Sequence, residues 1–229
     1  FPKAKNELKR PVVANVDVAL IVTSVKKPDL SLSLLDKELT VILANKIEPV
    51  ICFTKLDLLD KKEKKDLKPL IKYYKSIGIK VVSNKNLFSI KRILKNKVVV
   101  LTGQTGAGKS SLLNKLGKDL NIETKPISEA LNRGVHTTRH TELYKIGNIY
   151  FVDTPGFSSL DLTDLSKEQI RTSFLEFSHY NCKFKDCFHL KEKDCLVKDN
   201  VGKNILPSRY LNYGRFIKEE NENSSKLYK

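Results

Sequence analysis

One glycine-rich run carries the clearest chemistry in this sequence of 229 residues. Residues 103–111 read GQTGAGKSS and match the pattern G-x-x-x-x-G-K-[S/T], directly after an apolar run and directly before a segment with helical spacing. Glycines let backbone N–H groups turn inward at a helix N-terminus, where they can bind phosphate. Lys109 can then reach the β- and γ-phosphates, and the Ser110 hydroxyl can ligate Mg²⁺. The pattern predicts a nucleotide-binding loop made of Gly103, Gln104, Thr105, Gly106, Ala107, Gly108, Lys109, Ser110 and Ser111.

A second short motif, Asp153-Thr154-Pro155-Gly156, follows the apolar run 149–152. A carboxylate at the C-terminal end of a strand can hold a Mg²⁺-bound water, and the Gly156 backbone N–H can contact the γ-phosphate. Alone, such a D-x-x-G sequence is a commonplace turn. It indicates a nucleotide site only because the phosphate loop precedes it. We predict that Asp153 and Gly156 line the same nucleotide site.

A base-reading motif precedes both of these motifs in the chain. The run Thr54-Lys55-Leu56-Asp57 follows the apolar segment 50–53 and differs at one residue from the guanine-reading pattern N-K-x-D. The Asp57 carboxylate can accept hydrogen bonds from N1–H and the exocyclic amine of guanine, whereas adenine would leave a buried charge unpaired. Lys55 can lie over the base. These four residues predict a preference for GTP over ATP, and the alternative is a helix N-terminal Asp with an incidental lysine.

The order of these motifs is permuted. GTP-binding proteins usually carry the phosphate loop first and the base reader last, but here Asp57 precedes Lys109. A permutation is tolerated because each loop still follows its own strand into one crevice, while the chain ends move to a different surface. The motif at 153–156 then leads almost directly into the C-terminal part of the chain. A loop that responds to the γ-phosphate could therefore move an attached binding surface.

Three cysteines and a histidine form a second cluster with chemical potential. Cys182, Cys187, His189 and Cys195 offer three thiolates and one imidazole within a short stretch, a set that suits tetrahedral Zn²⁺. Four protein ligands leave no open position, so we predict one structural zinc, with His179 as the reserve ligand. Free cysteines beside a basic loop are the alternative. Metal-site spacing also indicates a reducing compartment, and we expect a cytoplasmic protein.

The charge balance favours a polyanionic partner. The chain has 42 Lys and Arg against 26 Asp and Glu, a formal net charge of +16. Such an excess favours nucleic acid through counterion release, although a lysine-rich composition that only aids solubility gives the same number. Lysines and two phenylalanines surround the cysteine cluster, and they read equally well as an RNA surface or as a small core.

No apolar run reaches the length of about 18 residues that a membrane span needs, so we expect no membrane partner.

The elements that position these residues alternate along the chain. Apolar runs predict strands at 16–23, 49–53, 80–83, 98–101, 143–146 and 149–152, and helical spacing predicts helices at 32–43, 60–76, 89–94 and from 109. This alternation predicts an α/β fold with a doubly wound sheet over residues 11–162. From residue 163 the pattern changes to helix, cysteine cluster and helix, which predicts a small, mostly helical zinc-binding domain over 163–229. We expect its polar tail after Lys218 to fray.

Taken together, the motifs resemble one family closely. They are Arg10-Pro11 with Asn15-Val16-Asp17, the TKLD run, the loop 103–111, the GVHTT run at 134–138, the DTPG run and the cysteine cluster. In this order they are similar to RsgA (also called YjeQ), the circularly permuted GTPases that act in maturation of the bacterial small ribosomal subunit. The resemblance runs from about residue 6 to 216. It implies a P-loop GTPase fold and an N-terminal OB-fold, of which residues 1–10 are interpreted as the trailing edge; RNA binding through that fold stays open.

The resemblance also assigns roles in the long segment between the phosphate loop and Asp153. A threonine there completes Mg²⁺ coordination when the γ-phosphate is present, and Thr138 is favoured over Thr137 because Arg139 follows it. With Thr138, the predicted Mg²⁺ ligands are Ser110 and Asp153. His136 resembles the family histidine proposed to position the attacking water; a surface histidine is the alternative. Residues 83–85, Ser-Asn-Lys, stand where many GTPases have S-A-K as the second base-contacting loop.

The function implied is GTP hydrolysis by a late assembly factor of the small (30S) ribosomal subunit, which binds rRNA in a nucleotide-dependent way and acts as a monomer. Phe157 occupies the position where Ras-type enzymes carry a water-orienting glutamine, so basal turnover should be slow. One alternative is a permuted GTPase of the large subunit, but those members lack a cysteine module after D-x-x-G. Another is a nucleotide-gated RNA-binding module whose turnover is incidental.

Overall fold

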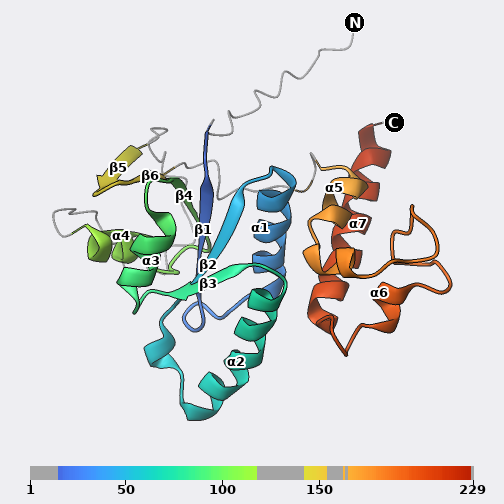
Figure 1. Ribbon diagram of the computed structural model, residues 1–229, viewed down its shortest axis with the longest axis horizontal. Helices are drawn as coiled ribbons and strands as arrows, with labels where there is room; N and C mark the ends of the chain where they lie inside the picture. Colours follow the sequence, from blue (N-terminus) through green and yellow to red (C-terminus); the bar gives the residue numbers. More distant parts are fainter. Residues whose placement is uncertain (1–14, 118–141, 154–161, 163–164, 228–229) are drawn as a thin grey trace, which may run out of the picture.

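A computed structural model describes residues 15–117, 142–153, 162 and 165–227. Six strands form one sheet in the order β3-β2-β1-β4-β6-β5 (Figure 1). All neighbours pair in parallel except β5 and β6, which form an antiparallel hairpin through a turn at Gly147-Asn148. The strands are β1 Val18–Ser24, β2 Glu48–Thr54, β3 Lys80–Ser83, β4 Val98–Thr102, β5 Glu142–Ile146 and β6 Ile149–Asp153.

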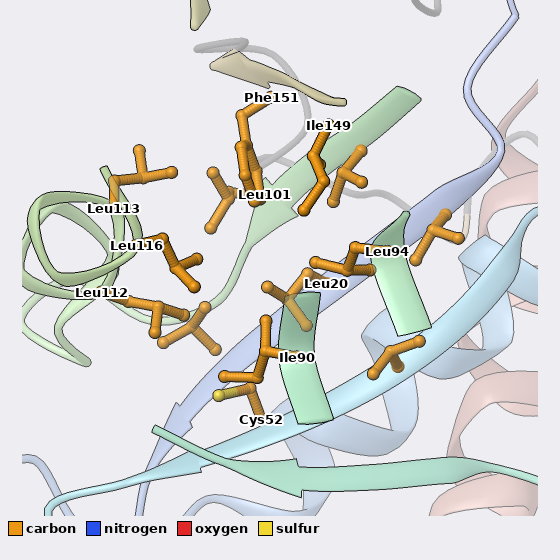
Figure 2. Close-up of a cluster of buried hydrophobic side chains, with 14 of the residues drawn as sticks. Leu20, Cys52, Ile90, Leu94, Leu101, Leu112, Leu113, Leu116, Ile149 and Phe151 are labelled. Carbon is orange, nitrogen blue, oxygen red and sulfur yellow. The ribbon is translucent and has the colours of Figure 1, made fainter. Parts of the chain in front are cut away.

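Helices cover both faces of this sheet. On one face lie α1 (Leu32–Ala44) and α2 (Lys61–Ser76), whose apolar side chains pack with alternate residues of β1 such as Ala19 and Ile21. On the other face, α3 (Leu87–Leu94) and α4 (Lys109–Leu116) pack with Leu20 and its neighbours, as Figure 2 shows. A strand buried on both faces needs a continuous apolar run, and every residue of β1 is buried. The predicted doubly wound α/β arrangement is therefore confirmed.

Local sequence signals set the helix starts. Asp60 caps α2 by accepting a hydrogen bond from the Glu63 backbone N–H at 2.8 Å, while the Glu63 carboxylate accepts one from the Asp60 backbone at 2.8 Å. This reciprocal pair satisfies two N–H groups that a helix start otherwise leaves unpaired. Ser31 and Asn86 cap α1 and α3 in the simpler way, each through one side-chain oxygen.

The C-terminal module, defined here as residues 163–229, packs against α1 (Figure 1). Its described elements are α5 Lys167–Thr172, the 3₁₀ turn η3 Leu175–His179, α6 Leu196–Asp199 and the long α7 Pro207–Leu227. Its core gathers stacked and edge-on aromatic rings, among them Phe174, Phe177 and Tyr213, and Val41 of α1 joins the same cluster. The module therefore shares a core with the sheet domain instead of hanging from a linker.

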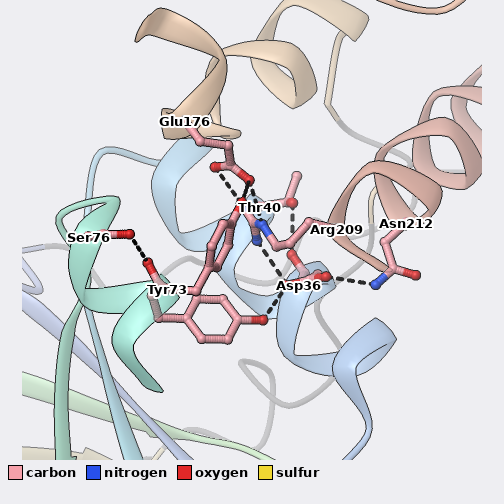
Figure 3. Close-up of polar contacts among 8 residues, drawn as sticks. Asp36, Thr40, Tyr73, Ser76, Glu176, Arg209 and Asn212 are labelled. Atoms are coloured by element: carbon pink, nitrogen blue, oxygen red, sulfur yellow. Dashed lines mark hydrogen bonds and ion pairs between the residues drawn. The ribbon is translucent and has the colours of Figure 1, made fainter. Parts of the chain in front are cut away.

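A buried ionic network fixes this packing (Figure 3). Arg209 of α7 donates to both oxygens of Glu176, at 2.8 and 3.1 Å, and to Asp36 of α1 at 2.9 Å. Asp36 also accepts hydrogen bonds from Tyr74 at 2.8 Å and Asn212 at 2.7 Å. The three charged side chains are at most 2% exposed. Buried charges are tolerated only when paired and hydrogen-bonded, and here each carboxylate has several donors.

Most expected boundaries shift by one or two residues, and two differences concern the start of β1 and the end of α7. Strand β1 begins at Val18, not at residue 16, because its pairing with β2 starts at Glu48, while the Asp17 side chain accepts a hydrogen bond from Val98. Beyond Lys218 the backbone stays helical, since α7 continues to Leu227, and the fraying of this tail stays a prediction. Just past Lys218, Glu219 pairs with Lys37 at 3.7 Å and Glu220 pairs with Lys167 at 3.9 Å. Among the described residues, no helix has the length and apolar character to cross a membrane.

Candidate nucleotide site and metal centre

Those predicted nucleotide residues that the structure describes gather at one edge of the sheet. Strands β1, β2, β4 and β6 run parallel, so their carboxyl ends share an edge. The chain moves outward from β1 through β2 to β3, and then outward in the other direction from β4 to β6. In open α/β sheets, ligands bind outside the carboxyl ends of the strands at such a switch point. Here the switch point lies between β1 and β4, and the run 103–111 begins where β4 ends.

The phosphate loop has the backbone form that its glycines allow. Gly103, Gly106 and Gly108 all have positive φ, and Gly108 caps α4 in the left-handed conformation. Gly103 is also required for steric reasons, since a Cβ there would lie 2.0 Å from the carbonyl oxygen of Val22 in β1. A side chain at residue 103 would therefore force apart two paired strands. The loop runs into the N-terminus of α4, where free N–H groups and the helix dipole favour an anion.

Lys109 lies over its own loop. Its Nζ donates to the carbonyl oxygens of Gly103, at 2.5 Å, and of Gln104, at 3.1 Å. This position keeps the ammonium group at the mouth of the loop, where it can meet a phosphate oxygen. Ser110 follows on the first turn of α4 and is partly exposed, as a hydroxyl that binds Mg²⁺ must be.

The base-reading run is joined directly to the phosphate loop. Thr54, the last residue of β2, donates from Oγ1 to the carbonyl of Ala107 at 2.6 Å. Lys55, in the left-handed conformation, donates from Nζ to the carbonyl of Gly106 at 2.8 Å. Leu56 and Asp57 begin the 3₁₀ turn η1 (Leu56–Leu58), which leaves Asp57 exposed to solvent. Residues far apart in sequence thus meet in one site, and two hydrogen bonds fix their spacing.

The Ser83-Asn84-Lys85 loop lies beside this run, because the Asn84 backbone N–H donates to the carbonyl of Phe53 at 3.1 Å. The side-chain oxygen of Asn84 is buried and has no hydrogen-bond partner among the described residues. Most buried polar atoms in proteins are paired, so an unpaired oxygen at this edge marks a place where a ligand can complete the bonding.

The remaining predicted nucleotide residues fall partly or wholly outside the description. Asp153 ends β6 at the same sheet edge, as expected, but its side chain is not described. His136, Thr138 and Gly156 all lie outside the described residues.

The cysteine cluster forms a compact ligand set. All four ligand atoms of Cys182, Cys187, His189 and Cys195 lie within 4.8 Å of one another. The Sγ atoms of Cys182 and Cys195 are 3.8 Å apart, and His189 Nδ1 is 3.5 Å from the first and 3.3 Å from the second. A tetrahedral zinc with bonds of about 2.3 Å to sulfur and about 2.0 Å to nitrogen places its ligand atoms about 3.5–3.8 Å apart. The donors therefore fit this metal, and the exposed His179 is not part of the group.

Neighbouring side chains orient the histidine. Its ring packs edge-on against Phe177 with centroids 5.2 Å apart, and its carbonyl accepts a hydrogen bond from the Tyr210 hydroxyl at 2.6 Å. Tyr213 donates in the same way to the carbonyl of Phe188, at 2.6 Å. Burial raises the pKa of the Cys187 thiol to about 12, so without a metal this thiol stays protonated at neutral pH. A cation that replaces the proton is the natural partner of such a set.

Sequence reasoning missed the polar residues of α1. Asp36 and Glu38 are both buried, Asp36 facing α7 and Glu38 facing the end of β4. A usable signal was present, because Asp36 lies beside Leu35 and one turn before Leu39, on the helix side that the apolar spacing assigns to the core. A carboxylate there needs a buried partner, but its partner, Arg209, is remote in sequence.

Comparisons with known proteins agree with this geometry. The RsgA GTPase family matches residues 1–163. The small ribosomal subunit biogenesis GTPase RsgA of Limosilactobacillus fermentum is 46% identical over 222 residues, which cover 93% of this chain and 75% of the relative. A second RsgA, from Oceanobacillus iheyensis, is 45% identical over 93% of this chain and 76% of its own length.

Solved structures match as well. The crystal structure of YjeQ from Thermotoga maritima has a TM-score of 0.79 and 34% identity, over 93% of this chain and 74% of the other. YloQ, described as a circularly permuted GTPase, has a TM-score of 0.75 and 36% identity, over 91% and 69%. With its permuted motifs on a doubly wound sheet and its Cys/His cluster in a helical C-terminal module, this chain belongs to the RsgA GTPase family.

Proposed function

We propose that this chain binds GTP at the carboxyl edge of its sheet and hydrolyses it as an assembly factor of the small ribosomal subunit. The observation that carries the nucleotide site is the pair of hydrogen bonds from Thr54 and Lys55 to the phosphate loop. They hold the predicted guanine reader and the predicted phosphate binder at a fixed separation. The partner comes from the relatives, which are named small ribosomal subunit biogenesis GTPases.

The proposal assigns roles to the predicted site residues. The backbone N–H groups of residues 103–111 bind the phosphates, and Lys109 turns from the carbonyls of Gly103 and Gln104 toward the β- and γ-phosphates. Asp57 accepts hydrogen bonds from the guanine edge. Ser110 and Asp153, with Thr138, are assigned to Mg²⁺, which supplies charge neutralisation when bound.

We further propose that the cluster in the C-terminal module holds one structural zinc. Four protein donors fill a tetrahedral shell, so no position remains for a substrate.

The module presents a basic, aromatic surface beside the metal. Phe184 is 49% exposed with the Lys183 ammonium 5.8 Å from its ring centre, whereas Phe188 is half-buried under Arg171. An exposed ring flanked by cations suits unpaired RNA bases, and we place the rRNA contact there.

The decisive experiment is GTP turnover by the purified chain alone, with small subunits and with large subunits. Basal turnover should be slow because Phe157 cannot orient a water molecule. Small subunits should stimulate it strongly, and the stimulation should fade with rising salt because the chain carries a net charge of +16. Equal stimulation by large subunits would refute the small-subunit assembly role, and no stimulation at low salt would select a nucleotide-gated RNA-binding module.

His136 is proposed as the residue that positions the attacking water. His136→Ala should then reduce the stimulated turnover much more than it reduces GTP affinity. An equal effect on both would remove the histidine from the catalytic step and leave the assembly role intact. We also propose that the chain is a cytoplasmic monomer, whose molar mass in light scattering should stay at one chain at all protein concentrations.

A further inference from the structure

Glu38 is a buried carboxylate that the proposed chemistry of the nucleotide site does not use. It lies on α1, is 6% exposed, and accepts a hydrogen bond at 2.9 Å from the hydroxyl of Thr102, which is fully buried. Thr102 ends β4 and is followed directly by Gly103, the first residue of the phosphate loop. The Gly103 backbone N–H and the positive charge of Lys109 both act to lower the pKa of this carboxylate.

We propose that Glu38 is a positioning residue of the nucleotide site, which anchors the start of the phosphate loop through Thr102 and Gly103 and balances the charge of Lys109. The inference rests on the proposed nucleotide site at residues 103–111. Phosphate affinity depends on N–H groups that already point inward before the ligand arrives, because ordering them on binding would cost affinity. An anchor at the first peptide of the loop fixes the direction of these N–H groups before binding, and it does so without contacting the ligand.

Its burial makes the ionised form of this carboxylate unfavourable for stability. Burial raises the pKa of Glu38 to about 7, although Thr102, Lys109 and Gly103 each act to lower it. A carboxyl with a raised pKa destabilises the folded chain as the pH rises from about 4.5 to about 7, because the folded state holds the proton more tightly than the unfolded chain does. Above that range the cost is fully present. A residue kept at such a cost beside a binding loop is expected to serve the loop.

The test is the variant Glu38→Gln, which keeps the shape of the side chain and removes its charge. The amide oxygen can still accept from Thr102, but the amide NH₂ then meets a second donor, and the attraction to Lys109 is lost. We expect GDP and GTP to bind about tenfold more weakly in a fluorescent-nucleotide titration, the loss of one charge-assisted hydrogen bond. At about pH 8, the nucleotide-free variant should unfold at the same temperature as the unmodified chain or a higher one.

This pair of readouts separates positioning from a merely structural role, because a structural residue would lose stability and affinity together. The matched control is Glu48→Gln, which removes a carboxylate that pairs with Lys80 near the surface and should leave nucleotide affinity unchanged. Thr102→Val provides the partner variant, since it removes the hydroxyl at nearly constant volume. Its effect on affinity should not add to that of Glu38→Gln if the two residues act as one unit.

Three outcomes would overturn the inference. They are unchanged nucleotide affinity in Glu38→Gln, a variant that loses stability or fails to fold, and full additivity with Thr102→Val. A failure of the nucleotide site itself is distinguishable, because the unmodified chain would then bind no GTP. Ribosomal subunits take no part in the titration, so the result is also independent of the proposed assembly role.

Discussion

Removing the charge of Arg209 should destabilise the whole chain strongly. Arg209 is 1% exposed and neutralises two carboxylates, Asp36 and Glu176, that are 0% and 2% exposed. In Arg209→Met the new side chain can still pack on the Phe174 ring, which lies 4.4 Å from the guanidinium carbon, but both carboxylates lose their cation. Breaking a buried ion pair by removing one partner typically costs about 3–5 kcal/mol.

The remaining donors place the expected loss at the lower end of that range. Tyr73 still donates to Glu176 at 2.9 Å, and Tyr74 and Asn212 still donate to Asp36. A loss of about 3 kcal/mol, with a urea dependence of about 2 kcal/mol per M, lowers the unfolding midpoint by about 1.5 M. Urea unfolding followed by circular dichroism measures this shift.

Two variants control for packing and for the helix. Arg215→Met makes the same replacement at an exposed position of α7 and should change the free energy of unfolding by at most about 0.5 kcal/mol. Adding Asp36→Asn and Glu176→Gln to Arg209→Met removes the stranded charges and should recover at least half of the loss. If Arg209→Met shifted the midpoint no further than Arg215→Met, or if the neutral triple variant recovered nothing, the charge argument would be refuted.

Three further predictions concern the two sites. Asp57→Asn should exchange the guanine preference for xanthine in competition binding, and equal affinity of the unmodified chain for ATP and GTP would remove Asp57 as the base reader. Gly103→Ala should abolish nucleotide binding, because the new Cβ would clash with the carbonyl oxygen of Val22. Its control is Gly78→Ala, at a residue that also has a positive φ but open space around it. This control should cost only about 1–2 kcal/mol of stability and leave nucleotide affinity intact. Metal analysis should find about one zinc per chain, lost in Cys182→Ser and retained in Cys52→Ser, whose thiol lies in the sheet core; chelation should unfold the C-terminal module.

Much of the fold followed from local patterns. The buried strands are continuous apolar runs, and the helices carry apolar residues at helical spacing, so the alternation of elements could be predicted from single segments. The ends of the elements were predicted less exactly, because contacts with neighbouring elements help to decide them. Strand β1 begins only at Val18, where its pairing with β2 begins, and α7 continues beyond Lys218. The division of the chain near residue 163 stays a prediction. What the structure adds there is a shared core, in which Val41 of α1 packs among the aromatic side chains of the C-terminal module.

The sequence by itself determined the chemistry of the two sites. The predicted phosphate loop and base reader are short runs whose residue types suit a ligand only in that spacing, and the four Cys and His donors of the candidate metal centre lie within one short segment. Only the tertiary structure decided which distant residues support them. Thr54 meets Ala107, Glu38 meets Thr102, and Asp36 meets Arg209 through contacts between separate elements. Such contacts leave no periodic trace in the chain, because they depend on how helices pack on the sheet and not on local conformation.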